Sequence, residues 1–286
     1  MFKLQDQVVA RLANTLGTEL VKAEAQRGAR VGDLDAFDLI MRGRVLDLRQ
    51  QQQPTRENNG AMRALFEQAL RTDPNNSGAL AGDATSYFLE KSFGWAIPDV
   101  DYETKVLGQL DRAIAIDPDN VYAYWIKSEY LTITHRPDEA LRAVDAGLAI
   151  DANFANLYAA RGIAEIYVGH FEQAKTDVQQ AMRLSPRDAS LARWHNYLCA
   201  ADLGLQQFDA AIVEGSSAIE GGFRIFLPHT FLAAAYALKG DMEKAKAALA
   251  EARRLNPKLS VKSMAERYAN VPSIAEGLRK AGLAEE

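Results

Sequence analysis

His195 and Cys199 are the residues whose types and spacing best suit chemistry, because both side chains can bind a metal and they lie four positions apart. That spacing puts the two side chains on one face of a helix. A structural zinc site needs four such ligands, and no third or fourth follows at a useful spacing. We therefore interpret the pair as core packing or hydrogen bonding. Cys199 is the only cysteine, so no disulfide forms within the chain.

Two short acidic clusters offer the carboxylate oxygens that calcium prefers. Neither cluster has the glycine or the ligand spacing of a calcium-binding loop, so we interpret both as caps of helix N-termini. The glycines are dispersed, and neither common glycine-rich phosphate-binding motif occurs. We therefore predict no catalytic, cofactor or metal site and no enzymatic activity. The clusters are Asp33, Asp35 and Asp38, and Asp99, Asp101 and Glu103.

The charge balance argues against nucleic acid as a partner. Among 286 residues, 33 Lys and Arg stand against 38 Asp and Glu, so the net charge of −5 leaves no cationic face for a phosphate backbone. The longest stretch without a charged residue, 225–238, has 14 residues and is too short to cross a bilayer. The N-terminus lacks the layout of a secretory signal. We expect a cytoplasmic protein without a membrane span; a periplasmic location stays open if an upstream span is missing from this chain.

An internal repeat organises most of the chain. Alanine-rich apolar segments end at an Asp-Pro-like turn six times, and three of the five spacings between these turns are 34 residues. A proline cannot continue the helix before it, and a second break divides each unit, so each unit is predicted to hold two helices. One hairpin cannot bury both of its apolar faces, but a stack of hairpins can. The turns lie at Pro74, Pro118, Ala152, Pro186, Phe223 and Pro257.

The pattern within the units resembles the tetratricopeptide repeat family. The resemblance implies an all-α fold, a right-handed α-solenoid of about six helical hairpins over residues 31–257. Insertions near residues 50–59 and 89–100 interrupt the pattern. The two units that match best carry Tyr158, Gly162, Ala174, Val178, Ala181 and Pro186, and Leu232, Ala233, Tyr236, Gly240, Ala245, Leu249, Ala252 and Pro257.

The flanks suggest helices outside the repeats. Residues 1–30 are predicted to form an amphipathic helix, either a cap on the first hairpin or a homodimer contact, and residues 258–286 are predicted to form capping helices. The phrases FKLQDQVVARLANTLGTEL and PSIAEGLRKAGL resemble the C-terminal repeat region of bacterial class III adenylate or guanylate cyclase and TolB-like multidomain proteins. That resemblance implies a regulatory fragment of a signalling protein.

Stacked hairpins leave a concave face lined by their first helices, which we predict to bind a peptide or protein partner. The positions on this face are aromatic and apolar, which favours an extended apolar peptide or a helix and disfavours a C-terminal carboxylate. Trp125→Ala is then expected to weaken partner binding by about 1–3 kcal/mol without unfolding the chain. The alternative that neighbouring segments bury several of these side chains stays open. The predicted groove residues are Tyr122, Trp125, Glu129, Asn156, Ile163, Ile166, Trp194, Leu227 and Thr230.

Overall fold

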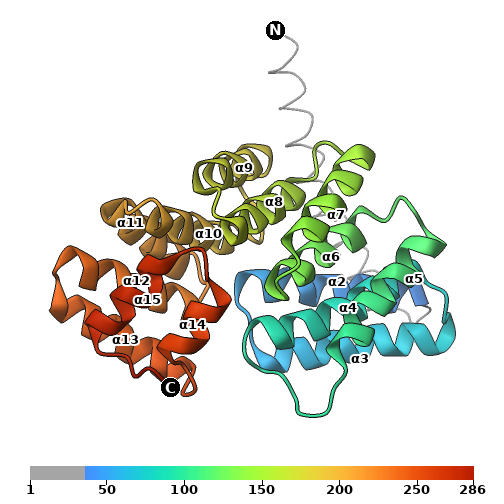
Figure 1. Ribbon diagram of the computed structural model, residues 1–286. Helices are drawn as coiled ribbons and strands as arrows, with labels where there is room; N and C mark the ends of the chain where they lie inside the picture. Colours follow the sequence, from blue (N-terminus) through green and yellow to red (C-terminus); the bar gives the residue numbers. More distant parts are fainter. Residues whose placement is uncertain (1–35) are drawn as a thin grey trace, which may run out of the picture. The chain divides into compact units, whose positions relative to one another are not determined.

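The computed structural model describes residues 36–286, which contain fourteen α-helices, one short π-helix and no strand (Figure 1). The helices follow one another as hairpins, which confirms the predicted all-α fold class. No helix in this part of the chain is both long and apolar enough to cross a bilayer. The helix predicted over residues 1–30, and Asp33 and Asp35 of the first acidic cluster, lie outside the described residues.

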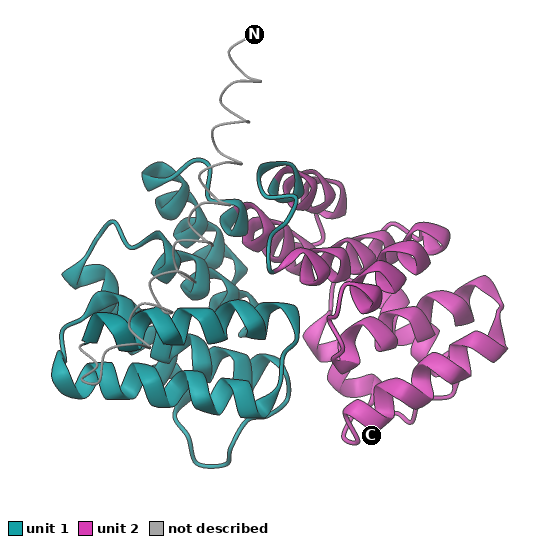
Figure 2. Ribbon diagram, turned by 180° about the vertical axis from the view of Figure 1, so that it is seen from behind, with its two compact units in different colours: residues 1–157, 181–189 teal, residues 158–180, 190–286 magenta. Residues whose placement is uncertain are grey.

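Two compact units divide the chain (Figure 2). Unit 1 comprises the described residues 36–157 together with 181–189, and unit 2 comprises residues 158–180 and 190–286. The division falls within α8 (Ala155–Val168) and α9 (Phe171–Leu184), so this hairpin contributes residues to both units. Each unit is described separately below.

Unit 1 holds three complete hairpins, and the predicted turns end their second helices. After α3, the backbone N–H of Asp73 donates to the Ala69 carbonyl, and the Asn76 side chain caps the next helix by accepting from the Ala79 N–H. The hairpins are α2 (Ala36–Gln52) with α3 (Arg56–Thr72), α4 (Ser77–Ser92) with the π-helix η1 (Thr104–Gly108) and α5 (Gln109–Ile116), and α6 (Val121–Ile133) with α7 (Pro137–Ile150).

Unit 2 continues the same plan and adds two C-terminal helices. Gly240 ends α12 with a φ of 96°, a left-handed conformation that favours glycine, and the Asp241 side chain then caps the next helix. Its hairpins are α10 (Leu191–Gly204) with α11 (Phe208–Glu220), and α12 (Phe226–Lys239) with α13 (Met242–Leu255). The C-terminal helices are α14 (Val261–Arg267) and α15 (Pro272–Ala281).

The core of unit 1 is organised around Phe66 of α3, whose side chain is fully buried. Its ring lies against two glycines, Gly43 of α2 and Gly82 of α4. A Cβ atom added at Gly82 would lie 2.4 Å from the ring, and one added at Gly43 would lie 2.7 Å from it. The absence of a side chain at both positions therefore lets one aromatic ring join three helices at close range.

The residues predicted as an insertion near 89–100 span the end of α4 and a loop that projects from the hairpins of unit 1 (Figure 1). A partly buried hydrogen-bond chain holds this loop. The Ile97 N–H donates to the Tyr102 hydroxyl (2.8 Å), this hydroxyl donates to Glu90 (3.0 Å), and Glu90 pairs with Arg63 (2.6 Å). Phe93 and Trp95 pack edge to face at 5.1 Å between ring centroids. The insertion is therefore an ordered part of the fold.

Candidate protein-binding surfaces

The first helices of the three hairpins of unit 1 share one face, which we call the first-helix face of unit 1. A polar row crosses it from α2 to α6. The Tyr122 hydroxyl donates to Asp47 at 2.9 Å and lies 3.0 Å from the Thr85 hydroxyl, and the Arg44 guanidinium lies 3.8 Å from the centre of the Tyr122 ring. Burial raises the pKa of Tyr122 well above its usual value, so its hydroxyl stays neutral. This face is therefore bound together by a buried polar network.

The predicted groove residues of unit 1 are mostly buried on this face. Trp125 is 2% exposed and packs against the rings of Tyr122 (5.2 Å) and Phe154 (6.1 Å). Glu129 is buried as well, and Asn156 is half-buried. Because Trp125 has almost no exposed surface, its binding role stays a prediction.

The remaining predicted groove residues lie on the first helices of unit 2, and all five are buried. They lie on α8, α10 and α12, where other parts of the chain cover them. The five residues are Ile163, Ile166, Trp194, Leu227 and Thr230.

The C-terminal segment, residues 261–286, lies across the first helices of unit 2, α8, α10 and α12, and contacts each of them. The Asn270 side chain donates to the Tyr167 carbonyl of α8 (2.5 Å), and the Ser273 hydroxyl donates to the Leu203 carbonyl of α10 (2.7 Å). Further along α15, a Cβ atom added at Gly277 would lie 2.6 Å from the carbonyl oxygen of Ala234 in α12. α15 therefore crosses the first-helix face of unit 2 with its backbone in close contact.

Both ends of the C-terminal segment are held. At one end the Tyr268 ring packs on the rings of Tyr167 (5.4 Å) and Phe231 (5.3 Å). At the other end the chain folds back, because the N–H groups of Val261 and Lys262 donate to the carbonyls of Ala284 and Glu285 at 3.0 Å each. Ile274, Leu278 and Ala281 form the buried side of α15.

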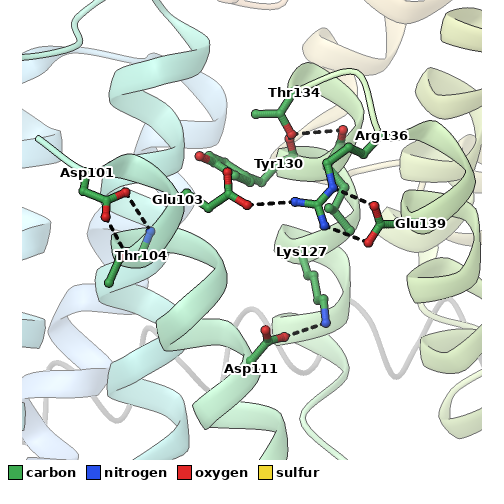
Figure 3. Close-up of polar contacts among 10 residues, drawn as sticks. Asp101, Glu103, Thr104, Asp111, Lys127, Tyr130, Thr134, Arg136 and Glu139 are labelled. Carbon is green, nitrogen blue, oxygen red and sulfur yellow. Dashed lines mark hydrogen bonds and ion pairs between the residues drawn. The ribbon is translucent and has the colours of Figure 1, made fainter.

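A polar surface of unit 1 lies where α6 and α7 meet the segment before α5 (Figure 3). Arg136 holds both oxygens of Glu139 at 2.6 and 2.8 Å and also reaches Glu103 at 2.9 Å. The Arg136 hydrogen bonds hold the pKa of Glu139 below its usual value. The Arg136 guanidinium therefore binds two carboxylates.

Two further contacts border this surface (Figure 3). The Thr104 N–H and hydroxyl both donate to Asp101, which lowers the pKa of that carboxyl and gives it the capping role that the sequence predicts. Burial, with a smaller effect from the nearby carboxylates, raises the pKa of Tyr130 to about 12. Lys127 of α6 pairs with Asp111 of α5 at 2.5 Å.

His195 and Cys199 do lie on one helix, α10, but the two side chains have different environments. His195 bonds to Glu214 of α11 at 2.6 Å, whereas Cys199 is fully buried. Within residues 36–286 no group of three or more potential metal ligands comes together.

Cys199 is expected to resist thiol reagents in the folded protein. Its side chain is 0% exposed, and burial raises the pKa of the thiol well above its usual value, so almost no thiolate forms near neutral pH. A chromogenic disulfide reagent should detect no thiol in buffer and one thiol per chain in denaturant. Rapid labelling without denaturant would contradict the packing of α10.

Comparisons with known proteins show which proteins resemble this chain in sequence. Residues 229–259 match the tetratricopeptide repeat family. A stretch of 84 residues is 36% identical to the DnaJ homolog subfamily C member 7 homolog of Schizosaccharomyces pombe; the match covers 28% of this chain and 18% of the relative. The findings support a protein built from tetratricopeptide repeats.

Solved structures share the fold at low sequence identity. The Cut9–Hcn1 hetero-tetramer of the APC/C superposes with a TM-score of 0.64 at 15% identity over 90% of this chain and 46% of that one. TTC0263, a thermophilic tetratricopeptide repeat protein of Thermus thermophilus, superposes with a TM-score of 0.54 at 18% identity. The match covers 70% of this chain and 98% of TTC0263. The chain thus spans less than half of the first structure. The likeness to cyclase and TolB-like proteins stays a prediction.

Proposed function

We propose that this chain is a non-enzymatic protein-interaction module that binds a helix of a partner along the first-helix face of unit 2. The observation that supports the proposal is α15 itself, which lies on that face as a bound helix would. Arrays of helical hairpins commonly use such a face for binding.

The path of the C-terminal segment distinguishes this proposal from simple capping. A helix that only covered the last hairpin would need contacts with α12 and α13. The segment instead also reaches α8 through Asn270 and α10 through Ser273, using carbonyls at the ends of those helices. It therefore follows the course of a ligand across three successive first helices.

The first-helix face of unit 2 determines which residues a ligand helix needs. Where α15 crosses α12, the backbone at Ala234 leaves room only for a residue without a side chain, which is Gly277 in α15. Apolar residues on the same side of α15 are buried. A partner helix is therefore expected to carry a small residue at its centre with large apolar residues three before and one after it, as Ile274 and Leu278 are in α15.

Gly277→Leu is expected to expel α15 and open the face. The new side chain would collide with the backbone of α12, which cannot move aside as a flexible side chain could. A fluorescent peptide with the sequence of residues 270–286 should then bind the full-length variant. The wild-type chain should bind it at least about tenfold more weakly, because its own α15 competes at an effective concentration near millimolar. Fluorescence anisotropy measures both affinities.

The matched control is Glu276→Leu, which adds the same side chain at the neighbouring exposed position. It should leave peptide binding at the wild-type level. Circular dichroism checks that Gly277→Leu keeps its helices, and Ser273→Ala, which loses only the bond to Leu203, provides a milder variant with a smaller gain in binding. A folded Gly277→Leu variant that binds no better than wild type would refute the proposal.

The wider biological setting stays a matter for prediction. The cyclase-type signalling context, the homodimer through the N-terminal helix and the cytoplasmic location rest on the sequence alone, and the binding role of Tyr122, Trp125 and Glu129 rests on repeat spacing. The helix-binding proposal depends on none of these.

A further inference from the structure

A cavity of about 240 Å³ opens between α6 and α7 of unit 1, away from the first-helix face. Leu131 and Ala143 are buried residues in its lining, and Ala146 adds an exposed apolar surface. The volume is below the roughly 300–1,000 Å³ of pockets that hold drug-sized molecules. The cavity therefore suits one or two amino-acid side chains of a partner.

The charged residues of the lining differ in the hydrogen bonds that they can still make. Both oxygens of Glu139 already accept from Arg136 (Figure 3). Lys127 gives one of its three N–H bonds to Asp111, and Arg142 makes no hydrogen bond or ion pair within the described part of the chain. The charged donors that remain at the rim belong to Lys127 and Arg142, and the Tyr124 side chain also lines the cavity.

Cationic donors above an apolar floor select a particular chemistry. A carboxylate placed between Lys127 and Arg142 would gain charge-assisted hydrogen bonds without displacing an existing ion pair. A cation is disfavoured there, because it would approach the like charges of Lys127 and Arg142. An aliphatic group next to the carboxylate would cover Leu131 and Ala143.

We propose that this cavity, the α6–α7 pocket, binds an acidic side chain of a partner protein together with an adjacent aliphatic residue. Arg142 is the main recognition residue, Lys127 assists it, and the Arg136–Glu139 pair fixes the position of one wall. The site lies in unit 1 and is independent of the helix-binding face of unit 2.

The test uses two capped dipeptides that differ only in charge, acetyl-Leu-Glu-amide and acetyl-Leu-Gln-amide. Each is titrated into the full-length protein while NMR follows the methyl groups of Ala143 and Ala146. The Glu peptide should shift these methyl signals saturably and bind at least about fivefold more tightly than the Gln peptide. Added salt should reduce that preference.

Variants assign the preference to the pocket. Arg142→Gln should reduce the affinity of the Glu peptide to that of the Gln peptide, whereas Arg71→Gln, at an exposed position of α3 in the same unit, should change neither. Equal binding of the two peptides, no methyl shift, or an unchanged preference in Arg142→Gln would overturn the proposal. Tighter binding of free 4-methylpentanoate than of the Glu peptide would overturn the assignment to a partner's side chain.

Discussion

Phe66→Ala is expected to lower the free energy of unfolding by about 3–5 kcal/mol, the usual cost of removing a fully buried aromatic ring. The ring fills the space between Gly43 and Gly82, and neither glycine has a side chain that could collapse into the cavity left behind. Urea unfolding followed by circular dichroism measures the loss.

Phe37→Ala supplies the control, because Phe37 lies on α2 of the same unit but is 50% exposed. Its cost should stay within about 0.5 kcal/mol. Gly82→Ala offers a second check through coupling: it should destabilise the wild type, where its Cβ would lie 2.4 Å from the ring, and be tolerated in the Phe66→Ala background. Additive effects of the two substitutions would contradict the described contact.

Trp125→Ala is expected to destabilise the protein by about 3–5 kcal/mol rather than to act on binding alone. The sequence predicts a groove residue whose loss leaves the fold intact, but the structure leaves only 2% of Trp125 exposed and packs it on Tyr122 and Phe154. Thermal unfolding checks the expectation.

Trp95→Ala is the matched comparison, since Trp95 lies in the insertion loop and is only half-buried. It should cost clearly less than Trp125→Ala, because fewer contacts are lost. A melting temperature of Trp125→Ala equal to that of the wild type would restore the sequence-based interpretation of an accessible groove residue.

The repeat spacing predicted the hairpins well because proline acts locally. Pro74, Pro118 and Pro257 each lie two residues beyond the end of a helix, where the chain cannot remain helical. The repeat pattern does not locate the helix ends near residues 50–59. There α2 continues to Gln52, and the Gln51 side chain donates to Asp47 one turn earlier, a helical pair that the repeat pattern does not indicate.

The candidate sites could be predicted only in part, because repeat position does not say what covers a face. Ile163, Trp194 and Leu227 lie on first helices, but the repeat spacing does not indicate that α15 lies across those helices. The signal that could have indicated it is Gly277, a small residue between Ile274 and Leu278 on an otherwise apolar side. The α6–α7 pocket depends on tertiary packing as well, because Arg136 also reaches Glu103 and Lys127 pairs with Asp111 of another helix.

The backbone pairing of residues 284 and 285 with the start of α14 has a mechanical consequence. A pulling force applied at Glu286 reaches these two hydrogen bonds before it reaches α15, so they must break before α15 can peel away from α12. These two hydrogen bonds of the tail therefore resist tension applied from the C-terminal end. Release of α15 under a pulling force should accordingly begin with the breaking of these two hydrogen bonds.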